Sequence, residues 1–117
     1  MKKILTAAFC AAMASPALAQ GWPTGYEGVM LQGFYWDSYS DSQWKNLEKQ
    51  APELGSYYSL LWVPQSGKCL EDYNVMGYTP YYYFNQNSSF GSEAELRSMI
   101  GTMRQNGVGV LADVVIN

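Results

Sequence analysis

The sequence is rich in carboxylate and aromatic side chains and contains no histidine. Its 117 residues include ten tyrosines, four tryptophans, ten aspartates and glutamates, and two cysteines. Without histidine, these residues cannot complete a Ser-His-Asp triad, a Cys-His nucleophile pair or a zinc site that uses imidazole. Two cysteines are too few for a four-thiolate metal site or a disulfide framework. The chemistry open to this chain therefore rests on carboxylates, amides and flat aromatic rings.

The charge balance also limits the classes of partner that the chain is expected to bind. Seven lysines and arginines stand against ten acidic residues, which gives a formal net charge of −3. Nucleic-acid binding proteins usually carry a basic patch, so we expect no nucleic-acid partner. Aromatic residues make up 15% of the chain. Because disordered chains are poor in aromatic residues, most of the sequence is predicted to be globular.

Residues 1–19 have the pattern of a secretory signal peptide. Two lysines form a positive start, residues 4–14 are apolar, and residues 17–19 (ALA) form a cleavage site. The apolar run is shorter than the ~20 residues that a membrane-spanning helix needs. We therefore expect cleavage after Ala19, export to the periplasm or the medium, and no membrane span. An N-terminal core helix is the alternative.

Three apolar runs and two helical patterns follow along the mature chain. The runs at residues 29–36, 59–63 and 108–116 hardly alternate apolar with polar residues, which is typical of strands covered on both faces. Residues 44–54 and 92–106 place their apolar side chains at helical spacing instead. The order strand, helix, strand, helix, strand predicts an α/β fold of two successive βαβ units with parallel, adjacent strands.

The ends of the two predicted helices carry recognisable signals. Ser40 or Asp41 is the expected N-cap of the first helix, and Pro52 is expected to kink or restart it. Ser92 and Glu95, three residues apart, predict a capping box at the start of the second helix.

A long segment at residues 65–91 separates the second run from the second helix. It is predicted to be a loop, and loops of this length in compact domains are usually functional. Three parallel strands with two helices neither close a barrel nor cover both faces of a sheet. The last run would also leave an apolar edge exposed, which natural proteins avoid. We therefore expect residues 20–117 to be the N-terminal part of a larger protein, with a small three-stranded α/β domain as the alternative.

Three motifs resemble the α-amylases of glycoside hydrolase family 13. The first is residues 31–37 (LQGFYWD), and the second is residues 77–80 (GYTP), followed by residues 84–85 (FN) and 90–96 (FGSEAEL). The third is residues 113–117 (DVVIN), which matches the first signature region of the family up to its histidine. Each motif alone is a weak signal. Their order, their spacing and the preceding signal peptide together make a strong one.

The resemblance implies the family's fold and chemistry. The fold is a (β/α)8 TIM barrel, of which this chain would hold strands 1 to 3 with two helices, and a barrel of this type takes about 250 residues. The chemistry is retaining hydrolysis of α-1,4-glucosidic bonds in starch-like glucans by two carboxyl groups about 5–5.5 Å apart. The family carries these groups on later strands. We therefore expect no catalytic residue in this chain and no activity from it alone.

Binding residues are what the resemblance assigns to this chain. Tyr78 matches the family tyrosine that stacks on a glucose next to the scissile bond, and Asp113 matches a supporting residue of the active-site floor. Asn117 matches a calcium ligand, and an amide oxygen suits this hard cation. The other Ca²⁺ ligands would come from the rest of the barrel, which a complete fold requires. A packed loop tyrosine and a simple strand-end asparagine are the alternatives.

Other aromatic residues are assigned mainly to packing. The triple Tyr81, Tyr82 and Tyr83 is read either as extra sugar platforms, with Tyr82 as a candidate substrate contact, or as loop packing, which is favoured. Trp36 and Trp62 are expected in the core.

Two other functions remain open at this point. One is a different family 13 glycosidase or transglycosylase, because the regions that set specificity are absent. The other is a small secreted glucan-binding module that uses the aromatic loop.

Overall fold

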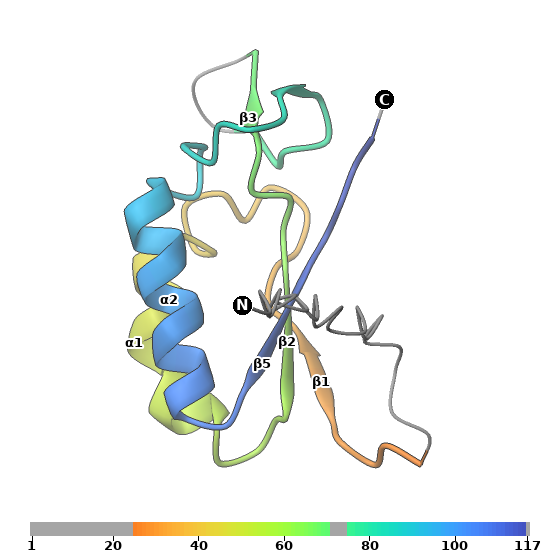
Figure 1. Cartoon of the computed structure of the whole chain (residues 1–117), viewed down its shortest axis with the longest axis vertical. Coiled ribbons are helices and arrows are strands. Elements are labelled where there is room, and N and C mark those ends of the chain that lie inside the picture. The colour runs from red at the N-terminus through yellow and green to blue at the C-terminus, as the bar shows by residue number, and fades with distance from the viewer. Residues whose placement is uncertain (1–24, 71–74, 117) are drawn as a thin grey trace, which may run out of the picture.

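The computed structural model describes residues 25–70 and 75–116 (Figure 1). The predicted signal peptide and Asn117 lie outside the described residues. The elements, in chain order, are β1 (Met30–Gln32), α1 (Trp44–Leu54), β2 (Leu60–Val63), β3 (Lys68–Cys69), β4 (Pro80–Tyr82), α2 (Glu93–Gln105) and β5 (Gly109–Ala112). Within the described ranges, no helix combines the length and the apolar character needed to cross a membrane.

The main sheet confirms the predicted α/β arrangement of parallel strands. Its order is β1-β2-β5, and both strand pairs are parallel. Leu61 of β2 lies between Leu31 of β1 and Val110 of β5. Each helix therefore connects two neighbouring parallel strands, as in a βαβ unit, and Figure 1 shows α1 and α2 side by side along the sheet.

The strands are shorter than the apolar runs that predict them. The first run spans residues 29–36, but β1 ends at Gln32. Asp37 has a φ of +64°, a left-handed conformation that Asn and Asp adopt more readily than most residues and that breaks an extended chain. The last run likewise continues to residue 116, whereas β5 ends at Ala112. Apolar content alone does not separate a strand from the loop that follows it.

Helix α1 begins at Trp44 without a side-chain cap, so the prediction of Ser40 or Asp41 as the cap is wrong. Gln43 occupies the N-cap position, and its side chain makes no capping hydrogen bond. The backbone amide of Trp44 instead donates to the carbonyl oxygen of Phe90 at 2.8 Å. A contact with the distant loop thus satisfies this helix end, and no local signal predicts such a contact.

Pro52 does not restart α1. The helix runs through Pro52 to Leu54 and ends at Gly55. Proline removes one backbone donor from the helix, but the helix ends after only two more residues.

Helix α2 confirms the predicted capping box. The Glu95 amide donates to Ser92 Oγ at 3.3 Å, and the Ser92 amide donates to Glu95 Oε2 at 2.7 Å. Glu48 of α1 accepts hydrogen bonds from two hydroxyls of α2, those of Ser98 at 2.7 Å and Thr102 at 2.8 Å. These bonds tie the two helices together across their shared face.

The core lies between the helices and one face of the main sheet. Helices contribute apolar residues at helical spacing, β2 contributes every second residue, and Phe90 joins them from the loop before α2. The largest fully buried side chains include Trp44, Leu61, Val63, Phe90, Met99, Met103 and Val108. Burying an aliphatic or aromatic side chain of this size contributes about 1.5–3 kcal/mol.

The long segment at residues 65–91 is not a plain loop. It contains a short antiparallel pair, β3 with β4, in which Lys68 faces Tyr82 and Cys69 faces Pro80. A shift in register between Lys68 and Cys69 interrupts the pairing. Two strands of two and three residues are too short to leave a visible alternation in the sequence.

Replacement of Ser92 by Ala tests the capping box. We expect Ser92→Ala to lower the free energy of unfolding by about 1 kcal/mol, because it removes the acceptor of the Glu95 amide. Urea unfolding of the protein expressed from its complete gene measures this change. Ser40→Ala is the matched control and should change stability by only a few tenths of a kcal/mol at most. Equal losses of stability in Ser92→Ala and Ser40→Ala would contradict the assignment of Ser92 as the helix cap.

Candidate functional site

The carboxyl ends of the main-sheet strands meet at one edge. Backbone pairing continues past the strand ends, because the Gly33 amide donates to the Trp62 carbonyl at 2.8 Å and the Asp113 amide donates to the Val63 carbonyl at 3.0 Å. Asp113 therefore lies directly beyond β5, beside the end of β2. In barrel enzymes this edge is the one that carries chemistry.

Tyr78 reaches this edge from the segment between β3 and β4. Its hydroxyl donates to Asp113 Oδ2 at 2.9 Å. Gly77 sets the direction of the chain immediately before it, with a φ of +93°. A Cβ at position 77 would lie 2.7 Å from the carbonyl oxygen of Gln65, so only glycine fits there. The structure thus brings together two of the predicted site residues, which are 35 positions apart in sequence.

Trp36 is the site residue that the sequence interpretation misplaced. Its ring is 71% exposed, so the prediction that Trp36 belongs to the core is wrong. It stacks on Tyr78, with ring centroids 6.0 Å apart and an interplanar angle of 9°. The reason is the early end of β1, which places Trp36 in the loop at the site. Trp62, which is also expected in the core, is only half-buried and packs edge-on against Phe34 beside the core.

A hollow of about 240 Å³ adjoins this aromatic pair. It is lined by Trp36, Asp37 and residues 75–79. The lining therefore combines two ring systems with a carboxylate and the hydroxyl of Thr79. Flat aromatic faces suit the apolar C–H face of a sugar, and polar groups beside them suit its hydroxyls.

Burial and a negative neighbour together raise the pKa of Tyr78. Burial is the larger cause, followed by the hydrogen bond to Asp113 and the charge of its carboxylate. All three disfavour the phenolate. At neutral pH Tyr78 therefore stays protonated, and its hydroxyl donates a hydrogen bond to Asp113.

Tyr82 lies outside this hollow. It belongs to β4, is 45% exposed, and lines a separate depression with Lys68, Leu70 and Asn85. Loop packing, the favoured interpretation of the tyrosine triple, does not bury these rings among the described residues, because Tyr81 and Tyr83 are also exposed. No sequence signal separates exposed from packed tyrosines in a run of three.

The predicted metal ligand cannot be placed, because Asn117 is outside the described residues. Among residues 25–70 and 75–116, no group of three or more His, Cys, Asp and Glu side chains could hold a metal ion.

Comparisons with known proteins agree with this fold. No family model matches the sequence. The chain is 34% identical to probable α-amylase 2 of Arabidopsis thaliana over 90 residues, which is 76% of this chain and 21% of that protein. It is also 34% identical to a glucan 1,4-α-maltotetraohydrolase of Roseateles saccharophilus, over 100% of this chain and 25% of that protein.

Solved structures show the same fold. The crystal structure of α-amylase I from Eisenia fetida superposes with a TM-score of 0.56 and 23% identity, over 77% of this chain and 18% of that one. The homologues place this chain with the glycoside hydrolases. Within that class it is homologous to the α-amylases, and it spans about a quarter or less of the length of these relatives.

Titration of individual tyrosines tests the contact between Tyr78 and Asp113. In a protein with ¹³Cζ-labelled tyrosine, NMR should show Tyr78 ionising above the ordinary pKa of about 10. Asp113→Asn removes the carboxylate charge, so the pKa of Tyr78 should fall toward that value.

Tyr35 supplies the matched control for this titration. Its pKa is also raised, by its hydrogen bond to Asp41 and then by the charge of that carboxylate. Asp41→Asn should therefore lower the pKa of Tyr35 and leave that of Tyr78 unaltered. If Asp113→Asn left the titration of Tyr78 unchanged, the contact would be refuted.

Proposed function

We propose that the whole protein carrying this chain is a secreted α-amylase that hydrolyses α-1,4-glucosidic bonds in starch-like glucans with retention. The observation that carries the proposal is the Tyr78–Asp113 contact, with Trp36 stacked on it, at the carboxyl edge of a parallel sheet. The α-amylase homologues support it. In this proposal residues 1–19 are a signal peptide and residues 20–117 begin the catalytic domain.

The same proposal makes the sheet a part of a (β/α)8 barrel. Both helices cover the face of Leu61 and Val63. On the opposite face Met30 is 47% exposed, and Leu60, Trp62 and Leu111 are only half-buried. In a closed barrel this second face points inward and is filled by side chains. Incomplete burial of four large side chains on it supports the barrel over a stand-alone domain.

Each residue of the edge has a role in binding the glucan. The free face of Tyr78 covers the C–H face of one glucose, and its hydroxyl is held by Asp113, which fixes the ring. Trp36 stacks on the opposite face of Tyr78 and so helps to hold the ring in its orientation. The nucleophile and the acid/base of a retaining mechanism would come from outside residues 20–117. This chain therefore supplies binding and positioning, not bond cleavage.

Calcium is a further part of the proposal. Asn117 supplies an amide oxygen, which belongs to the ligand chemistry that Ca²⁺ takes. Because Ca²⁺ takes six to eight oxygen ligands, the remaining ligands would come from other parts of the whole protein. The ion would hold the segment that follows β5 in the sequence.

Two substitutions of Tyr78 separate its ring from its hydroxyl. In the protein expressed from its complete gene, Tyr78→Ala should lower kcat/KM for a maltooligosaccharide by about 10- to 100-fold, because the stacking surface is lost. Tyr78→Phe keeps the ring and should cost only about 2- to 10-fold. Tyr57→Ala is the matched control, since Tyr57 is 72% exposed and precedes β2, at the opposite end of the sheet. Equal effects of Tyr78→Ala and Tyr57→Ala would count against the proposal.

Isolated residues 20–117 test where the catalytic groups lie. We expect this segment to release no reducing sugar from soluble starch, because it carries no nucleophile and no acid/base. The complete gene product, assayed in parallel, should be active. Hydrolysis by the purified segment alone would overturn the assignment of catalysis to the rest of the protein.

A further inference from the structure

Four consecutive aromatic side chains are exposed at the end of β4. Tyr81 is 62% exposed, Tyr82 and Tyr83 are each 45% exposed, and Phe84 is 100% exposed. We call these four residues the aromatic strip. Single exposed apolar residues are normal, whereas contiguous exposed apolar patches mark binding surfaces. Tyr81 and Tyr82 also contact one another edge to face, with centroids 4.9 Å apart.

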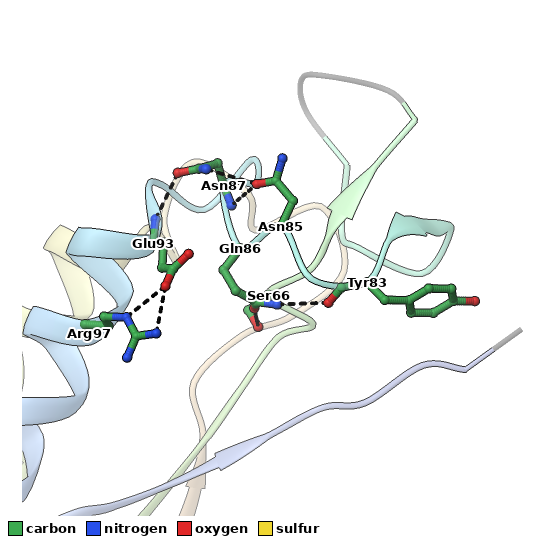
Figure 2. A network of polar contacts seen from close by, with 7 residues as sticks. All are labelled: Ser66, Tyr83, Asn85, Gln86, Asn87, Glu93 and Arg97. Carbon is green, nitrogen blue, oxygen red and sulfur yellow. Dashed lines mark hydrogen bonds and ion pairs between the residues drawn. The ribbon is translucent and has the colours of Figure 1, made fainter.

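The backbone that carries the aromatic strip is held in place by polar contacts. Figure 2 shows the turn after the strip tied to the rest of the chain through side chains, with the ring of Tyr83 projecting away from them. The side-chain Nε2 of Gln86 donates to the Tyr83 carbonyl at 3.3 Å, and Ser66 Oγ donates to Gln86 Oε1 at 2.5 Å. The Lys68 amide donates to the Asn85 carbonyl at 2.8 Å. The rings therefore stand on an anchored turn.

The turn is also joined to the start of α2. Asn85 Oδ1 accepts from the amide and the side chain of Asn87, at 3.0 and 2.9 Å. Asn87 Oδ1 in turn accepts from the backbone amide of Glu93 at 3.1 Å (Figure 2). An anchored aromatic surface loses little conformational entropy when a ligand binds to it.

A polar depression of about 220 Å³ lies beside the strip. It is lined by Lys68, Leu70, Tyr82 and Asn85. A ring next to an amide and an ammonium group matches a sugar, which has an apolar C–H face and hydroxyls around its rim. None of these residues lines the hollow at Tyr78. The two depressions are therefore separate sites on neighbouring parts of one segment.

We infer that the aromatic strip is a second contact for the α-glucan, outside the hollow at Tyr78. The inference rests on the proposed function, which supplies the occupant. Tyr82 follows Tyr78 by four residues in the same segment. This closeness in sequence argues that the same ligand binds at the aromatic strip and at the hollow. The strip itself carries no charged side chain, which suits an uncharged polysaccharide. The strip holds the polymer while a neighbouring part of the same chain occupies the hollow.

Affinity for starch tests this inference. The protein expressed from its complete gene is run on native gels that contain increasing amounts of soluble starch, and the dissociation constant is obtained from its retardation. We expect Tyr82→Ala to weaken affinity by about 2- to 10-fold. Tyr82→Phe keeps the ring and should bind like the wild type. Tyr57→Ala again controls for the loss of an exposed tyrosine elsewhere.

A second variant and a melting curve distinguish a loss of starch affinity from a loss of folding. Phe84→Ala removes a ring that is 100% exposed, so it should weaken starch affinity while leaving the melting temperature unchanged. Wild-type affinity in both Tyr82→Ala and Phe84→Ala would overturn the inference. So would a lowered melting temperature in these variants without a loss of affinity, because the strip would then pack against another part of the protein. A wild type that hydrolyses no maltooligosaccharide would instead refute the proposed function.

Discussion

Parallel pairing of β2 with its two neighbours is the constraint on which the site depends. In a parallel sheet all carboxyl ends lie at one edge, so the residues that follow β1, β2 and β5 meet there. The hydrogen bonds from Gly33 to Trp62 and from Asp113 to Val63 extend that alignment beyond the strands. A slip of one residue between β2 and β5 would turn the side chains to the other face and move Asp113 away from Tyr78.

The packing of the helices follows from the same pairing. Each helix returns the chain to the start of the next parallel strand, so both lie along one face of the sheet (Figure 1). Their buried residues then meet Leu61 and Val63 of the central strand. The Trp44 amide donates to the Phe90 carbonyl, which joins the end of the loop segment to α1, and Glu48 bridges the two helices. The segment that carries Tyr78 and the aromatic strip is thereby anchored to the helical layer at Phe90.

The sequence predicts well those features that depend on nearby residues. Periodicity indicates both helices, the capping box of Ser92 and Glu95 is visible at once, and the order of elements implies parallel strands. The sequence predicts poorly those features that depend on contacts between residues far apart in the chain. The start of α1 is satisfied by the carbonyl of Phe90, and Trp36 is exposed because β1 ends four residues earlier. The family resemblance singles out Tyr78 and Asp113 separately, whereas their hydrogen bond and the stacking of Tyr78 on Trp36 required the structure.

The most direct test of the account is a crystal structure of the protein expressed from its complete gene, with a maltooligosaccharide bound. The account predicts a glucose ring lying on the free face of Tyr78. The Tyr78 hydroxyl should still donate to Asp113, and Trp36 should remain stacked on the opposite face of Tyr78. A saccharide bound elsewhere, with Tyr78 covered by another part of the protein, would contradict the claim that this edge binds the substrate.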